Sequence, residues 1–267
     1  MEAIELKNVT FAYPDGHVAN EELNLVIRKG ERVAIVGQNG AGKTTAVKLM
    51  NALNKPTSGD VLINGINTKN QTTAQISAYV GYVFQNPDDQ IFNSNVQKEI
   101  EYMLHYLKLD QQEIERRVSR AVELTGIESY LHMNPFDVPY SIRRFVTIAM
   151  VLALETPYII LDEPTAGQDL IGIKTLSSLL DRLQEEGKAV ITITHDMEFV
   201  ADNFTRVVTM ANKRIISDDS ARNTFWSKEI ITEARIKKPQ IGEVAEELGL
   251  EGNIIFRHEL VEILKKY

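Results

Sequence analysis

The sequence predicts an α/β fold in which a mainly parallel sheet carries helices on both faces. Short apolar runs at 33–36, 158–161 and 189–194 are typical of buried strands, and residues 172–184 between the last two follow a helical pattern. Strands that alternate with helices along a chain form parallel sheets, because each crossover helix returns the chain to the same edge. We therefore expect a parallel core.

The first part of the chain predicts an antiparallel layer in front of this core. Residues 4–11 and 23–27 alternate apolar and polar side chains, as half-exposed strands do. Residues 61–63 end at an Asn-Gly pair, which favours a hairpin turn, and residues 79–84 form another β-rich run.

Helical patterns follow in the middle and at the end of the chain. Apolar residues recur at helical spacing at 95–130 and 141–154, which predicts a helical subdomain at about 95–155. Two short amphipathic helical patterns near the end of the chain predict a C-terminal appendage at 227–267, which leaves 1–226 as the main domain.

Composition and charge exclude several classes of protein. The 267 residues carry a formal net charge of -8, which disfavours a surface that wraps nucleic acid. Cysteine is absent, which excludes disulfides, thiol catalysis and Cys-ligated metals. No apolar run approaches the roughly 18 residues of a membrane span, and the N-terminus lacks a signal-peptide pattern. We expect a cytoplasmic protein without a nucleic-acid partner, which reaches a membrane only through another protein.

A phosphate-binding loop is the most specific motif in the chain. Residues 37–44, GQNGAGKT, match the pattern G-x-x-x-x-G-K-[ST] between a predicted strand and a predicted helix. The glycines let backbone N–H groups point at a polyphosphate, while Lys43 reaches the β- and γ-phosphates and the Thr44 hydroxyl ligates Mg²⁺. A Gly-rich turn before an ordinary helix is the alternative. We expect a nucleoside triphosphate on Gly37, Asn39, Gly40, Ala41, Gly42, Lys43, Thr44 and Thr45.

Three further strand ends carry polar residues that suit phosphate chemistry. Asp162 is expected to hold Mg²⁺ through water, and Glu163 to polarise the water that attacks the γ-phosphate. His195 and Gln85 each follow a predicted strand, and ligand sites of parallel sheets lie at the carboxyl ends of the strands. We expect His195 at the γ-phosphate and Gln85 at Mg²⁺ or the attacking water. Acidic loop residues and a structural histidine are the alternatives.

Together these motifs resemble the ATP-binding cassette (ABC) ATPases over roughly residues 1–225. The loop at 37–44 is similar to the Walker A motif of that family and residues 159–163 to its Walker B motif. Gln85 and His195 match the Q-loop glutamine and the switch histidine. The resemblance implies an ABC-type fold of the P-loop NTPase class, with an antiparallel β-subdomain and a helical subdomain. It also implies ATP hydrolysis with ATP and Mg²⁺, catalytic roles for Lys43, Gln85, Glu163 and His195, and Thr44, Gln85 and Asp162 as metal ligands.

Two further positions carry this resemblance. Tyr13, in the segment FAYP, occupies the place of the aromatic residue that stacks on adenine in the family, and a core tyrosine at a strand end is the alternative. Residues 166–169 resemble the D-loop, with Gln168 where leucine is usual.

Within the family, the chain is most similar to the ATPases of energy-coupling factor (ECF) transporters. The likeness rests on QNPDDQIF at 85–92, with its second glutamine at Gln90, on Pro-Phe-Asp at 135–137, and on Lys-Pro-Gln-Ile at 238–241. It implies that a membrane coupling subunit and a substrate-binding membrane subunit import a vitamin or a transition-metal ion. The chain would then lie on the cytoplasmic face of the membrane, with 85–92 against the membrane partner and the appendage available for dimerisation.

The LSGGQ signature of the family is altered in this chain. The aligned residues, 138–142, read Val-Pro-Tyr-Ser-Ile. In the family this segment contacts the γ-phosphate held by the partner ATPase subunit, a role that requires small residues and free N–H groups at a helix start. Pro139 has no N–H and Tyr140 adds bulk. Ser141 remains a candidate helix cap or phosphate contact.

The altered signature favours a heterodimer over a homodimer, because a homodimer would contain two poor sites. A partner with an intact signature would complete this chain's site. Arg143 and Arg144 are either solvated helix residues or a replacement source of positive charge. A soluble ABC protein that does not transport is an alternative, but such chains usually carry two cassettes or a coiled-coil insertion. A mainly regulatory subunit is another, and Glu163 and His195 count against it.

Overall fold

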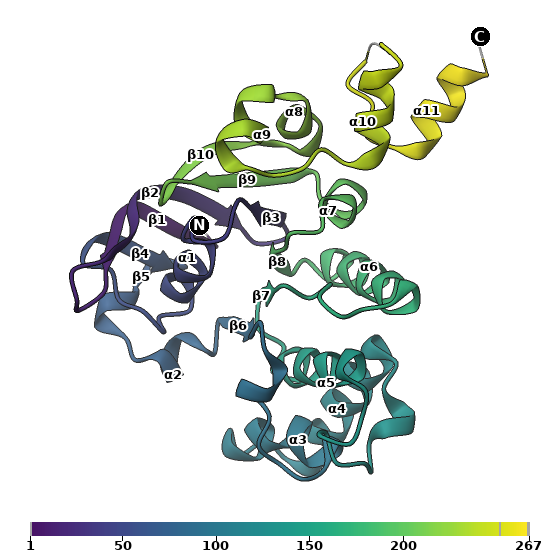
Figure 1. Cartoon of the computed structure of the whole chain (residues 1–267). Coiled ribbons are helices and arrows are strands. Elements are labelled where there is room, and N and C mark those ends of the chain that lie inside the picture. The colour runs from purple at the N-terminus through teal and green to yellow at the C-terminus, as the bar shows by residue number, and fades with distance from the viewer. Residues whose placement is uncertain (1, 251, 266–267) are drawn as a thin grey trace.

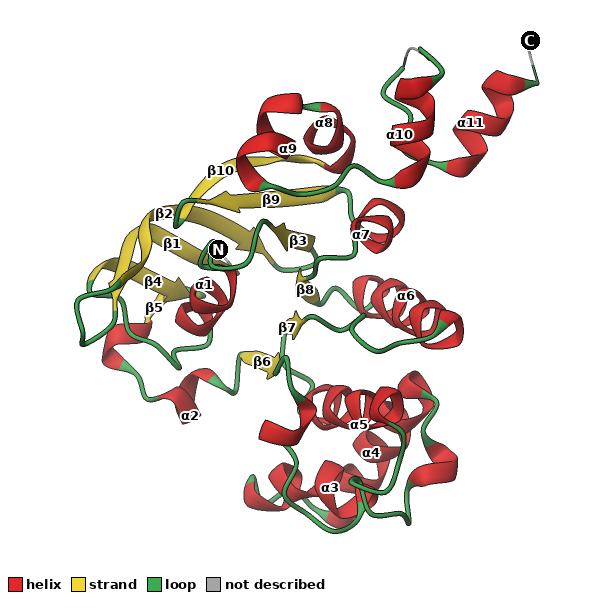
Figure 2. Ribbon diagram, in the orientation of Figure 1, coloured by secondary structure: helices red, strands yellow, loops and turns green. Residues whose placement is uncertain are grey.

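The computed structural model describes residues 2–250 and 252–265, and it contains two sheets (Figures 1 and 2). The smaller sheet has the order β2-β1-β4-β5, and its neighbouring strands are antiparallel. It is made of β1 (Ala3–Ala12), β2 (Val18–Arg28), β4 (Ser58–Ile63) and β5 (Ile66–Asn67). The predicted antiparallel layer and the predicted hairpin after residue 63 are therefore confirmed.

The central sheet has six strands in the order β10-β9-β3-β8-β7-β6. Five of them are parallel, and β10 runs antiparallel to β9 at the edge. The strands are β3 (Arg32–Val36), β6 (Val80–Val83), β7 (Tyr158–Asp162), β8 (Ala189–Ile193), β9 (Arg206–Ala211) and β10 (Arg214–Ser220). Every residue of β6, β7 and β8 is buried, as expected for parallel strands covered on both faces. The predicted parallel core is confirmed.

The central sheet separates two hydrophobic cores. Val33 and Ile35 of β3 lie in the core that the sheet shares with the antiparallel layer and with α1 (Lys43–Met50). Ala34 and Val36 lie in the other core, which includes residues of α6 (Leu170–Glu185). Successive side chains of a strand point to opposite faces, so one short apolar run supplies both cores.

Three helices form a subdomain on one side of the central sheet, at the bottom of Figure 1. They are α3 (Val96–Tyr106), α4 (Gln111–Thr125) and α5 (Tyr140–Ala153). Asn95 and Asp110 cap the first two, each accepting a hydrogen bond from the backbone N–H three residues later. The helical patterns predicted at 95–130 and 141–154 are thus confirmed.

Four short helices follow the last strand, along the top of Figures 1 and 2, with α10 and α11 at the right. These are α8 (Ala221–Trp226), α9 (Lys228–Ala234), α10 (Gln240–Glu247) and α11 (Arg257–Leu264). Only α10 and α11 were predicted. Helices α8 and α9 have six and seven residues, too few for a helical period to stand out in the sequence. The same holds for α2 (Thr73–Ile76) and α7 (Met197–Asn203).

The last two helices have a small core of their own, formed by Ala245, Ile254 and Leu260. By contrast, Ala234 and Ile236 pack in the main core. The division into 1–226 and 227–267 stays a prediction, and both of its outer ends lie outside the described residues. Within the described ranges, no helix is both long and apolar enough to cross a membrane.

The close approach of β6 to α5 generates a stability prediction. A Cβ added to Gly81 of β6 would lie 2.5 Å from Val151 Cγ1 and 2.9 Å from Thr156 Oγ1. We predict that Gly81→Ala lowers the free energy of unfolding by about 1–3 kcal/mol, because overpacking forces the neighbours apart. Chemical denaturation measures this change.

Adding Val151→Ala removes the nearer of the two contacts. The double variant should therefore lose less free energy of unfolding than the sum of the losses in the two single variants. Strict additivity would contradict the contact between these elements.

Candidate active site

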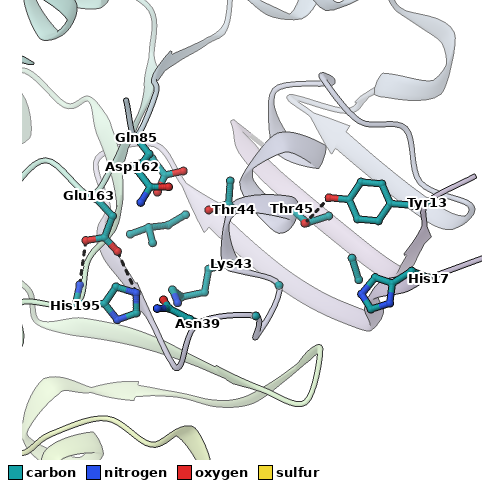
Figure 3. Close-up of a pocket in the computed structure, with 14 residues that line it drawn as sticks. Tyr13, His17, Asn39, Lys43, Thr44, Thr45, Gln85, Asp162, Glu163 and His195 are labelled. Carbon is teal, nitrogen blue, oxygen red and sulfur yellow. Dashed lines mark hydrogen bonds and ion pairs between the residues drawn. The ribbon is translucent and has the colours of Figure 1, made fainter. Parts of the chain in front are cut away.

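The predicted site residues gather around one cavity at the carboxyl ends of the parallel strands (Figure 3). The cavity has a volume of about 240 Å³. Strands β3, β6, β7 and β8 all end at this edge, because their registers pair Ile35 with Ile193, Val83 with Leu161, and Asp162 with Ile193. The predicted residues that line it are Tyr13, Asn39, Gly40, Gly42, Lys43, Thr44, Thr45, Gln85, Asp162, Glu163 and His195.

The phosphate loop curls around the ammonium group of Lys43. Its Nζ donates hydrogen bonds to the carbonyl oxygens of Gly37 at 2.7 Å and Gln38 at 3.0 Å. Burial lowers the pKa of Lys43, while the carboxylates of Glu163 and Asp162 oppose that shift. The loop therefore holds a cation at its centre, with the open cavity beside it.

Two predicted loop residues do not line the cavity. Gly37 has φ +143°, and a Cβ there would lie 2.1 Å from the carbonyl oxygen of Met210, so only glycine fits between the loop and β9. Ala41 is buried in the core that contains α1. Both residues shape the loop by backbone position and packing.

Asn20 supports the loop and was not predicted. It is fully buried in β2, and its Nδ2 donates a hydrogen bond of 3.1 Å to the carbonyl oxygen of Gly42, the residue that precedes α1. The contact joins residues 22 positions apart. No local pattern marks it, since a lone asparagine in an alternating strand reads as an outward-facing polar residue.

Asp162 has one satisfied and one unsatisfied oxygen. Its Oδ2 accepts a hydrogen bond of 2.9 Å from the Tyr82 hydroxyl, while Oδ1 is buried and has no hydrogen-bond partner among the described residues. Burial raises the pKa of this carboxyl, and the hydroxyls of Tyr82 and Thr44 oppose the shift. A buried, unsatisfied carboxylate oxygen is costly without a partner such as an ion or water.

These groups fit a magnesium ion. The described part of the chain has no cluster of three or more His, Cys, Asp or Glu side chains that would hold a metal by itself. Mg²⁺ needs no such cluster, because it usually binds one or two carboxylates together with phosphate oxygens and waters. Asp162 with the nearby Thr44 and Gln85 provides that kind of oxygen set.

Glu163 and His195 contact each other across neighbouring strand ends (Figure 3). The His195 backbone N–H donates to Glu163 Oε2 at 3.2 Å, and His195 Nε2 lies 3.3 Å from Glu163 Oε1. Burial raises the pKa of Glu163 to about 7, although the His195 N–H opposes the shift. Burial and the charge of Lys43 lower the pKa of His195. The histidine is therefore largely neutral at pH 7, and the carboxylate has the pKa that suits a general base.

The backbone of Glu163 is also unusual. Its φ is +52°, in the left-handed region that residues other than glycine seldom adopt. Its N–H donates to the carbonyl oxygen of Ile193 at 2.8 Å, which holds this conformation against the end of β8. Strained backbone of this kind concentrates at functional sites.

At the other end of the cavity, Tyr13 stands at the surface and not in the core. Its ring is 40% exposed, and its hydroxyl lies 3.3 Å from Thr45 Oγ1. His17 stacks on it with a centroid distance of 6.3 Å and an interplanar angle of 20°. The core alternative for Tyr13 is thus wrong. His17, Ala19 and Ile193 also line the cavity and were not predicted, because no motif marks them.

The start of α5 differs from two of our expectations. Pro139 and not Ser141 is the N-cap of the helix, and no side chain caps it. Arg144 is not solvated, since it is only 1% exposed and donates to the carbonyl oxygen of Gln85 at 2.6 Å. Arg143 is paired with Asp88 at 2.7 Å. Helical periodicity alone could not show that both guanidinium groups fold back onto the loop after β6.

Gln90, the second glutamine of the 85–92 segment, holds the end of β6. Its Nε2 donates to the carbonyl oxygen of Tyr82, and its Oε1 accepts from the N–H of Phe84, both at 3.1 Å. It thereby extends the strand's hydrogen bonding to Phe84, the residue before Gln85.

Comparisons with known proteins agree with this geometry. A protein-family model described as ABC transporter matches residues 20–166. A putative ABC transporter ATP-binding protein of Pyrococcus horikoshii is 35% identical over 263 residues, which cover 98% of each chain. The energy-coupling factor transporter ATP-binding protein EcfA of Methanocaldococcus jannaschii is 34% identical over 256 residues, 95% of this chain and 92% of that protein.

Solved structures are similar as well. The structure of cbiO1 from Clostridium perfringens, described as part of the ABC transporter complex cbiONQ, aligns with a TM-score of 0.78 at 32% identity. It covers 91% of this chain and 98% of its own. A dimeric ATP-binding cassette in a post-hydrolysis state, bound to ADP and Pi, aligns with a TM-score of 0.75 at 27% identity. That match covers 82% of this chain and 98% of the cassette.

Asn20 generates a prediction about the loop. We expect Asn20→Ala to weaken nucleotide affinity about 2- to 10-fold, because the Gly42 carbonyl oxygen keeps only the Ala46 N–H as a donor and the turn before α1 is less well fixed. Isothermal titration with ATP measures the change. Asn24→Ala on the same strand is the control, since the Asn24 side chain bonds Asn8 at the surface. Equal effects of the two substitutions would contradict the assigned contact.

Glu163 generates a prediction about stability without nucleotide and in EDTA. Its folded pKa of about 7 lies above the ordinary value of 4.5, so the folded protein favours the protonated form. Stability contributed by that form is complete below pH 4.5 and is lost as the pH rises through 7. Glu163→Gln should therefore be more stable than the unsubstituted protein at pH 8, by roughly 1–3 kcal/mol, and similar at pH 4.5.

Thermal unfolding at several pH values measures this difference. Glu123→Gln, at an exposed position of α4, should show no such pH trend. A Glu163→Gln difference that stays constant from pH 4.5 to 8 would refute the buried, proton-binding carboxyl.

Proposed function

Because this chain belongs to the ABC transporter family of ATP-binding and ATP-hydrolysing proteins, we propose that it energises nutrient import through a membrane complex of ECF type. We further propose that it works as one half of an asymmetric ATPase heterodimer. The relative named EcfA and the similarity to cbiO1 support the assignment to ECF-type import. The asymmetry rests on one observation. The chain has a complete set of phosphate-binding and water-activating residues, but the start of its helix α5 is poorly suited to binding phosphate.

Hydrolysis at this site uses residues that already meet at the cavity. Lys43 and the loop N–H groups hold the phosphates of ATP, and Thr44, Gln85 and Asp162 hold Mg²⁺, which neutralises phosphate charge when bound. Glu163 accepts a proton from the attacking water while the water oxygen forms a bond to the γ-phosphorus. The bond between the γ-phosphorus and the oxygen that bridges to the β-phosphate breaks, and that oxygen leaves with ADP. His195 keeps the Glu163 carboxylate in place through its two contacts. Tyr13, partly exposed at the other end of the cavity, is our candidate for stacking on adenine.

The start of α5 is the weak part of the machinery. A helix start that binds a partner's γ-phosphate needs free N–H groups and little side-chain bulk. Pro139 offers no N–H at the N-cap, and Tyr140 places a half-exposed ring on the first turn. An ATP bound to the partner would therefore gain little from this chain, whereas a partner with an intact signature would complete the site described above.

The similarity to a dimeric cassette supports a site shared by two chains. A dimeric relative bound to ADP and Pi has the same fold. A second chain that closes over the phosphate loop would supply the missing wall.

We assign membrane docking to residues 85–92 at the cytoplasmic face. Phe92 is 60% exposed and packs edge-to-face on Tyr102 of α3 at 4.6 Å. A membrane subunit that binds this exposed aromatic pair would contact the loop that carries Gln85 and would thereby move that residue in the site. The transported substrate, a vitamin or a transition-metal ion, would be selected by the substrate-binding membrane subunit and not by this chain.

The appendage is our candidate for dimerisation. Its exposed apolar residues are Val244 of α10, Leu248 directly after that helix, and Val261 and Leu264 of α11. A mainly regulatory subunit with weak turnover is the second candidate function, and the altered helix start favours it. The contact between Glu163 and His195 at the cavity favours catalysis, because a site that only binds ATP needs no positioned base.

Turnover by the isolated chain tests the heterodimer. We expect the purified chain to bind ATP but to hydrolyse it at near-background rate, because no intact signature faces its phosphate loop. Adding the partner ATPase and membrane subunits should raise turnover at least about 100-fold. That is the usual effect on rate of one set of positioned groups that stabilise the transition state. Robust hydrolysis by the isolated chain, lost on Glu163→Gln, would show that a homodimer suffices.

A further inference from the structure

The start of α5 touches the loop that follows β7 in the same chain. Gln168 Nε2 donates a hydrogen bond of 3.1 Å to the carbonyl oxygen of Ser141. The Tyr140 ring lies directly against Gly167, where an added Cβ would be 3.0 Å from Tyr140 Cδ1. Two places at which this chain departs from the family's pattern, the signature segment and Gln168, are therefore in contact.

The same helix reaches the site through a buried arginine. Arg144 Nη2 donates to the Gln85 carbonyl oxygen at 2.6 Å and to the Tyr140 hydroxyl at 3.1 Å, and Nη1 lies 3.4 Å from the Asp162 carbonyl oxygen. No carboxylate within 4 Å pairs with it in the described ranges. A buried guanidinium held only by neutral acceptors is costly. It joins the ends of β6 and β7, which carry Gln85 and Asp162.

The loop that carries Glu163 is held from both sides. At the β8 end, Thr165 Oγ1 lies 3.0 Å from Thr194 Oγ1, beside the Glu163 contacts with Ile193 and His195. At the α5 end, Gln168 and Tyr140 provide the contacts described above. The left-handed backbone of Glu163 is thus fixed between a strand and the altered helix start.

From these contacts we infer that Tyr140, Arg144 and Gln168 are positioning residues of this chain's own ATP site. The altered signature, which is poorly suited to a partner's phosphate, instead fixes the water-activating and metal-holding loops of its own chain. Tyr140 and Gln168 act on the Glu163 loop, and Arg144 sets the separation of the Gln85 and Asp162 backbones. This inference rests on the proposed hydrolysis at this site and adds residues to it.

Conservative substitutions separate positioning from folding. Tyr140→Phe removes one hydroxyl and Gln168→Leu one amide, while Arg144→Lys keeps the charge but cannot reach three acceptors at once. Tyr106→Phe and Gln112→Leu make the same chemical changes at exposed positions of α3 and α4. Each variant is made in the full-length chain. The unfolding temperatures of Tyr140→Phe and Gln168→Leu are compared with those of their controls, and that of Arg144→Lys with the unsubstituted chain.

Two measurements follow. Isothermal titration gives the ATP dissociation constant of the chain in Mg²⁺ and in EDTA, and steady-state kinetics gives kcat and KM of the assembled complex. For Arg144→Lys, and also for Tyr140→Phe, which removes the hydroxyl bonded to Arg144, we expect unchanged affinity in EDTA and a two- to tenfold loss of the tightening that Mg²⁺ provides. For Gln168→Leu, which removes the contact between the Glu163 loop and Ser141, we expect unchanged ATP affinity and KM, with kcat lowered two- to tenfold.

The outcomes distinguish the inference from the proposed function. Normal Mg²⁺ tightening in Arg144→Lys and Tyr140→Phe, together with a kcat of Gln168→Leu equal to that of Gln112→Leu, would overturn the inference alone. Failure of the unsubstituted chain to bind ATP would overturn the proposed function and the inference with it. If Arg144→Lys does not fold, the Mg²⁺ tightening of Tyr140→Phe and the kcat of Gln168→Leu decide.

Discussion

The parallel alignment of β6, β7, β8 and β3 is the constraint on which the rest of the structure depends. Four strands end at one edge, so the loops that follow them are brought within a few ångströms although they lie up to about 160 residues apart in sequence. Glu163 meets His195, and Lys43 influences both, only because their strands are neighbours in register. The antiparallel layer adds Tyr13 and Asn20 to the same edge from outside the central sheet.

This constraint explains which site residues the sequence could predict. Gln85, Asp162, Glu163 and His195 lie at or just after the end of a strand with a strong apolar pattern, so their convergence follows from the sheet. Lys43 is joined to such a strand, β3, by the phosphate loop, which its motif marks. Other contacts depend on packing between elements that no local pattern links. Asn20 and His17 enter from the antiparallel layer, and the burial of Arg144 is decided by the fit of α5 against β6. Short helices such as α8 and α9 owe their position to the core around Phe225 and Ala234.

The helix start at Pro139 links the proposed heterodimer to the geometry of this chain's own ATP site. Its sequence makes it a poor binding site for a partner's phosphate, and its contacts tie it to the Gln85 and Glu163 loops of the same chain. Loss of one role and gain of the other are physically compatible, because a bulky ring on the first helical turn obstructs an anion while packing on a neighbouring glycine. A chain of this kind would hydrolyse ATP at its own phosphate loop and serve its partner's site weakly.

The most direct test of this asymmetry is ATP turnover by the assembled complex with Glu163→Gln in this chain alone, compared with the same substitution in the partner alone. We expect Glu163→Gln to lower turnover by about 100-fold or more, the usual contribution of a general base, while the partner's substitution leaves most of the activity. Similar losses from the two substitutions, or retention of at least half of the activity in Glu163→Gln, would contradict it.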